Sequence, residues 1–91
     1  MLPYQAHSPT SYEAAVQAEP DAATLRGKVL QAIRRTKGFG ATDEEIQRRL
    51  IMNPSTQRPR RIELVRAGLV REASITRRTR SGRKATVWTA V

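Results

Sequence analysis

The chain has 91 residues, which is enough for one small domain. It carries 17 Lys and Arg against 8 Asp and Glu, and its formal net charge is +9. Such an excess repels cationic ligands and destabilises a compact chain, so it argues against an ordinary metabolic enzyme and favours a polyanionic partner. The chain contains no Cys and one His, which excludes a disulfide framework, a thiolate zinc site and a His-rich metal site.

The positive charge is concentrated in the second part of the sequence. Residues 55–91 hold ten Lys and Arg and two Glu, whereas residues 1–54 hold seven basic and six acidic side chains. Nine of the ten basic residues in 55–91 are Arg, whose planar guanidinium forms paired hydrogen bonds with phosphates and with the edge of guanine. We therefore expect this part of the chain to contact nucleic acid.

Residues 1–20 are predicted to form a flexible tail, because they contain several Pro residues and few large apolar ones. Within this tail, residues 10–13 fit a capping box and precede a run of helix formers, so they predict a short helix over 11–18 that ends before Pro20. No apolar run in the chain approaches the roughly 20 residues of a membrane span, and the N-terminus lacks the pattern of a signal peptide. A cytoplasmic protein is expected.

The domain proper is predicted over 21–91 and begins with two helices. Asp21 is a suitable N-cap for the first helix, which ends at the glycines of 38–40. The apolar residues of this helix recur at the spacing of one helix face: Leu25, Val29, Ala32 and Ile33. Residues 42–45, Thr-Asp-Glu-Glu, form a second capping box with three acids in the first turn. This acidic run is interpreted as capping rather than as a metal site, and its helix is predicted to stop at Asn53-Pro54.

A third helix is predicted to begin near Thr56 or Gln57, with Ser55 or Thr56 as its cap, and to close at Gly68. Pro59 is then accommodated in the first turn, where its missing amide hydrogen removes no helical bond.

After Gly68 the apolar period changes to two, which predicts a β-hairpin. Leu69, Ala73 and Ile75 are expected to share one face of the first strand, and residues 85–91 alternate in the second. Ser81-Gly82 is the turn signal, and it lies in a strongly basic tip. Trp88, late in the last strand, is expected to pack in the core or in an interface.

This order of elements resembles a winged helix-turn-helix. The residues that carry the resemblance are the Thr42–Ile46 helix start, the 53–56 turn, the Ala67-Gly68-Leu69-Val70 exit and the Ser81–Trp88 wing. The resemblance implies a mainly α, α+β domain with three helices and a basic wing, similar to small phage-type or bacterial regulators of transcription or replication. It further implies a nucleoid-associated protein of a bacterial or phage-infected cell.

The resemblance and the charge together predict a surface that binds double-stranded DNA. The start of the third helix is expected in the major groove, with Gln57 on adenine, an Arg on guanine, and Ser55 and Thr56 on phosphates. Arg60 is the best-placed base reader on a helical wheel, and the wing is expected on the backbone or in the minor groove. The predicted contact residues are Ser55, Thr56, Gln57, Arg58, Arg60, Arg61, Arg77, Arg78, Arg80, Arg83 and Lys84.

One alternative is an interaction module of the same fold, which uses its basic face on an acidic protein partner. Double-stranded RNA is less favoured as a target because its deep, narrow major groove excludes a helix. The residues supply no catalytic constellation, and we expect no enzyme activity, no cofactor and no small-molecule ligand. Because one recognition helix makes few base contacts, we also hypothesise a homodimer, with residues 11–18 or the strand of Trp88 at its interface.

Overall fold

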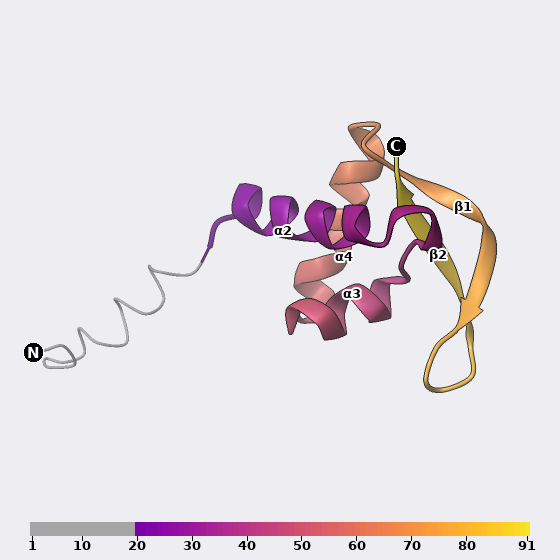
Figure 1. Cartoon of the computed structure of the whole chain (residues 1–91). Helices are drawn as coiled ribbons and strands as arrows, with labels where there is room; N and C mark the ends of the chain where they lie inside the picture. The colour runs from indigo at the N-terminus through magenta and orange to yellow at the C-terminus, as the bar shows by residue number, and fades with distance from the viewer. Residues whose placement is uncertain (1–19) are drawn as a thin grey trace, which may run out of the picture.

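A computed structural model describes residues 20–91 of the chain. It consists of three α-helices and a 3-10 turn, followed by two antiparallel strands: α2 (Ala22–Arg35), η1 (Lys37–Phe39), α3 (Asp43–Leu50), α4 (Pro54–Arg66), β1 (Val70–Arg78) and β2 (Lys84–Ala90). The α+β prediction is confirmed, and the layout is compatible with a winged helix (Figure 1). The helix predicted over 11–18 lies outside the described residues.

The first two helices start at the predicted caps. The Asp21 carboxylate accepts a hydrogen bond from the Thr24 amide at 2.9 Å. At the start of α3, the Thr42 hydroxyl accepts from the Glu45 amide at 3.2 Å, and the Glu45 carboxylate accepts from the Thr42 amide at 3.0 Å. Both helices are thus fixed by local signals. They bury one apolar face each, through Val29, Ala32 and Ile33 in α2 and Ile46 in α3.

The start of α4 differs from the prediction. The helix begins at Pro54, and its N-cap Asn53 makes no side-chain capping bond, because the Asn53 side chain instead accepts from the Ser55 hydroxyl at 3.2 Å. Pro54 has the fixed φ that suits the first helical position, and this preference replaces the predicted Ser or Thr cap. Pro59 therefore lies inside the helix, beyond its first turn.

The end of α4 turns the chain sharply into the hairpin. Gly68 has φ +77°, its amide donates to the Val65 carbonyl at 3.0 Å, and the Leu69 amide donates to the Leu64 carbonyl at 3.0 Å. These two bonds form a Schellman motif, which confirms the predicted glycine stop. The motif places Val70 in the core, and β1 starts there.

The two strands pair with an irregular register. Glu72 lies opposite Trp88, but Thr76 lies opposite Thr86, so β1 has additional residues between these pairs. Leu69 precedes β1 and Ile75 lies in the irregular stretch, and both are exposed, whereas Val70 is buried. The prediction that Leu69, Ala73 and Ile75 share one face of a regular strand does not describe β1, because the strand begins at Val70 and its register shifts between Glu72 and Thr76.

A short backbone bridge joins the helices to β2. The Ala41 amide donates to the Trp88 carbonyl at 2.9 Å, and the Trp88 amide donates to the Ala41 carbonyl at 2.8 Å. Trp88 is half-buried and packs against the core, which is one of the two environments predicted for it. The residues buried in this core come from the three α-helices, from the bridge residue before α3 and from β1: Val29, Ala32, Ile33, Ala41, Ile46, Leu64 and Val70.

Candidate nucleic-acid interface

The start of α4 and the loop of the hairpin lie at the same end of the molecule (Figure 1). The loop comprises residues 79–83 between the strands. Gly82, with φ +86°, donates its amide to the Thr79 carbonyl at 2.9 Å, and the Thr79 amide donates to the Arg83 carbonyl at 2.8 Å. The loop is also held to α3, because the Arg80 amide donates to the Glu44 carboxylate at 3.2 Å. Helix start and loop thus form one connected surface.

Arg61, a predicted contact residue, is held inside the domain. Its guanidinium donates to both carboxylate oxygens of Asp43, at 3.0 and 2.7 Å, and lies 4.1 Å from the centroid of the Trp88 ring. Only 16% of its side chain is exposed. A paired ion contact stacked on an aromatic ring ties α4 to α3 and β2. Arg61 is therefore a positioning residue in this structure.

Gln57, which was expected to pair with adenine, is 0% exposed. Its amide donates to Asp43 Oδ1 at 3.0 Å, and its carbonyl oxygen accepts from the Gln47 amide at 2.8 Å. Burial raises the pKa of Asp43, but the hydrogen bonds from Arg61 and Gln57 and the nearby charges of Arg61 and Arg58 outweigh it, so this pKa lies below its usual value. Gln57 is thus part of the contact between α3 and α4, and both polar atoms of its side chain are hydrogen-bonded within the domain.

Arg60, the favoured base reader on the helical wheel, faces α2. Its guanidinium donates to both oxygens of Glu63, at 2.9 and 2.7 Å, and Arg26 of α2 donates to the same carboxylate at 2.9 Å. Its side chain is 19% exposed. Arg58 is exposed instead, because the buried face of α4 is formed by Gln57 and Leu64.

Arg77 anchors the hairpin instead of extending from it. Its guanidinium donates to the Glu45 carboxylate at 2.7 Å and to the Phe39 carbonyl at 2.7 Å, and it lies 4.0 Å from the centroid of the Phe39 ring. Burial raises the pKa of Glu45, yet the hydrogen bonds from Arg77 and the Thr42 amide lower it further than burial raises it. β1 is thus fastened to the connection between α2 and α3.

The remaining predicted residues stay on the surface. Arg78 donates to the Gly82 carbonyl at 2.7 Å and so follows its own loop. Within residues 20–91, the side chains of Arg58, Arg80, Arg83 and Lys84 have no ion pair, and all four are exposed. Ser55 is exposed, and Thr56 is half-buried.

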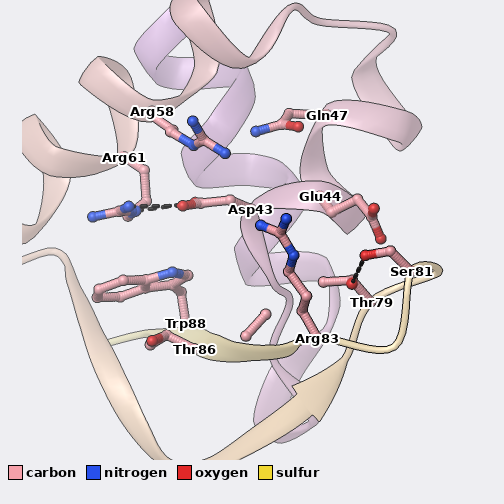
Figure 2. A pocket seen from close by; sticks show the side chains of 11 residues that line it. Asp43, Glu44, Gln47, Arg58, Arg61, Thr79, Ser81, Arg83, Thr86 and Trp88 are labelled. Atoms are coloured by element: carbon pink, nitrogen blue, oxygen red, sulfur yellow. Dashed lines mark hydrogen bonds and ion pairs between the residues drawn. The ribbon is translucent and has the colours of Figure 1, made fainter.

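A cleft of about 300 Å³ separates the start of α4 from the hairpin loop. Figure 2 shows Arg58 entering it from α4 and Arg83 from the hairpin, with Asp43, Glu44 and Gln47 on the side of α3. The acidic run at the start of α3, which the sequence identifies as capping, also contributes Asp43 and Glu44 to this cleft. Glu44 pairs with Arg48 at 3.0 Å, as their i,i+4 spacing favours.

Residues 20–91 contain no cluster of His, Asp and Glu suited to a metal ion. None of their helices has the length and apolar character needed to cross a bilayer. Comparison of the chain with known protein families, with curated proteins and with solved structures gave no match. A function must therefore be argued from the residues and geometry themselves.

Proposed function

We propose that this protein binds double-stranded DNA as a winged helix-turn-helix domain and regulates transcription or replication by occupying its site. The observation that carries the proposal is the position of the exposed cations. The start of α4, which carries Arg58, and the hairpin loop, which carries Arg80 and Arg83, lie at one end of the domain (Figure 1), and none of these three side chains forms an ion pair within residues 20–91.

The connections between elements support a winged helix. The Ala41–Trp88 bridge gives β2 a neighbour on its second edge, so a minimal third strand precedes α3. The chain then runs from α3 through a short turn into α4 and leaves by the Schellman motif into the hairpin. In helix-turn-helix domains the second of these helices enters the major groove, with its N-terminal residues on base edges.

The arginines have different tasks in this proposal. Arg58 is the α4 arginine that is exposed near the helix start, and its guanidinium suits either the guanine edge or a backbone phosphate beside it. Ser55, exposed in the first turn, suits a phosphate. Arg80, Arg83 and Lys84 on the loop suit the backbone or a narrow minor groove. Arg60, Arg61 and Arg77 hold the helices and hairpin that present these groups.

The proposal is tested by measuring duplex binding at several salt concentrations. A triple substitution of Arg58, Arg80 and Arg83 by Ala should weaken binding strongly and reduce the salt slope by about 2–3, since each lost phosphate contact removes about 0.9. The matched control replaces three exposed cations on other parts of the domain, Lys28, Arg66 and Arg71, and removes the same charge.

Equal losses of duplex affinity in the two triple variants would show that the protein binds DNA only as a generic polycation, and would overturn the proposal that one end of the domain is the binding surface. Unchanged duplex binding by the Arg58, Arg80 and Arg83 variant would overturn DNA binding through this end and favour the acidic protein partner. Selection of bound duplexes from a random pool then separates sequence readout from charge alone.

A further inference from the structure

The cleft between α4 and the hairpin has charged groups on both walls. Arg58 projects from the second turn of α4, and Arg83 projects from the end of the hairpin loop (Figure 2). The two residues are 25 positions apart in the sequence. They face the same space because the Arg80 amide is hydrogen-bonded to Glu44 at the start of α3, which holds the loop beside the helices.

The carboxylates of the cleft already have partners. Asp43 receives three hydrogen bonds from Arg61 and Gln57, and Glu44 receives bonds from Arg48 and from the Arg80 amide. Neither carboxylate forms an ion pair with Arg58 or Arg83 within residues 20–91. Both guanidinium groups therefore retain their donors for a ligand. The Arg58 charge acts on Asp43 only through space, where it helps to lower the pKa of the Asp43 carboxyl group.

The Arg58 and Arg83 guanidinium groups line the cleft together with the Thr79 and Ser81 hydroxyls, which are hydrogen-bonded to each other at 3.0 Å (Figure 2). Two guanidinium groups at one cleft suit an oxyanion. The volume of about 300 Å³ is ample for a phosphate group. Arg suits this ligand because its planar fork hydrogen-bonds to two oxygens at once.

We propose that Arg58 and Arg83 together bind one phosphate of the DNA backbone in this cleft. This inference rests on the proposed function and adds a specific claim to it. One phosphate held from both walls couples α4 to the hairpin loop, so it sets the angle at which the helix enters the groove. The helix and the loop then bind DNA as one unit and not as two independent basic patches.

A double-mutant cycle on duplex binding tests this coupling. Arg58→Ala and Arg83→Ala should each weaken binding, and the double variant should lose about five- to tenfold less affinity than the product of the single losses. The matched cycle combines Arg58→Ala with Arg80→Ala, since Arg80 is exposed on the same loop but does not line the cleft. That cycle should be additive.

Duplexes with a single methylphosphonate, which removes one phosphate charge, identify the bound group. At one backbone position the neutral linkage should abolish the effects of both Arg58→Ala and Arg83→Ala. An additive Arg58–Arg83 cycle, or neutral positions that differ for the two arginines, would overturn the shared phosphate. Wild-type protein that binds no duplex would instead overturn the proposed function.

Inorganic phosphate distinguishes the backbone from a free ligand. NMR signals of the Arg58 and Arg83 guanidinium groups should shift together with duplex and respond only weakly to inorganic phosphate. Saturation of both signals by inorganic phosphate, with an additive cycle on DNA, would assign the cleft to a free phosphate compound and overturn the backbone assignment.

Discussion

Ile51 is the residue whose replacement tests the backbone conformation of the turn between α3 and α4. It caps α3 in the left-handed conformation, with φ +53° and ψ +52°, and it is 94% exposed. For a side chain with a branched Cβ this conformation is unfavourable by about 1–2 kcal/mol, and little apolar burial offsets it here. We expect Ile51→Asn to stabilise the protein, since Asn tolerates left-handed backbone.

Ile51→Asn should raise the free energy of unfolding by about 1 kcal/mol, because it relieves the unfavourable backbone conformation. Ile51→Gly should raise it less, because the greater conformational entropy of glycine stabilises the unfolded chain by about 0.4–1 kcal/mol. For a domain of this size 1 kcal/mol corresponds to a rise in Tm of about 4–8 °C. Urea and thermal unfolding measure both, and Ile51→Val, which keeps the branched Cβ, should leave stability unchanged.

Destabilisation by Ile51→Asn and Ile51→Gly would refute this reasoning. It would mean that the Ile51 side chain is covered, by residues 1–19 or by a second copy of the chain. Repeating the unfolding at several protein concentrations separates these two cases, because only a dimer makes the transition depend on concentration.

Three further outcomes are expected. Gly40→Ala should destabilise the protein by about 2–4 kcal/mol in urea unfolding, since its Cβ would lie 2.5 Å from Val87 Cγ1 at a residue with φ +72°. An unchanged midpoint would contradict the close contact. Glu44→Gln should tighten duplex binding by a few-fold at low salt and less at high salt, because it removes a negative charge from the cleft while its amide oxygen still accepts from the Arg80 amide. Weaker binding would argue against DNA in the cleft. The pKa of Asp43 is lower in the folded state than its unfolded value of 3.8, so the Asp43 carboxylate stabilises the fold at pH values above 3.8. This stabilisation is lost as the pH falls from 3.8 through the folded pKa. Urea unfolding at pH 7 and pH 3 should therefore show a smaller difference for Asp43→Asn than for wild type.

The elements that the sequence predicts well are those fixed by short-range signals. The Asp21 cap, the Thr42 capping box and the Gly68 stop each depend on groups within a few residues of one another, and each is present in the structure. The start of α4 was missed because two local signals compete there. Pro54 favours the first helical position, and this preference prevailed over a hydroxyl cap from Ser55 or Thr56.

The site is harder to predict because it depends on contacts between distant residues. Arg61 and Asp43 are 18 positions apart, and Arg77 and Glu45 are 32 apart. A helical wheel shows which side of α4 a residue occupies, but not which neighbouring helix supplies a carboxylate. The wheel therefore favoured Arg60, whose partners are Glu63 in its own helix and the α2 helix beside it.

The acidic residues explain how so basic a domain presents a defined surface. Asp43, Glu45 and Glu63 each bind an arginine that would otherwise repel its neighbours, and each of these pairs joins two elements of the fold. Removing one of these carboxylates would leave a half-buried guanidinium without its partner and loosen a helix or the hairpin. The arginines that remain unpaired within residues 20–91, such as Arg58 and Arg83, then stand on elements whose positions are already fixed. Fixed positions are what a protein needs to bind particular phosphates and base edges, because flexible cations on a tail provide affinity without register.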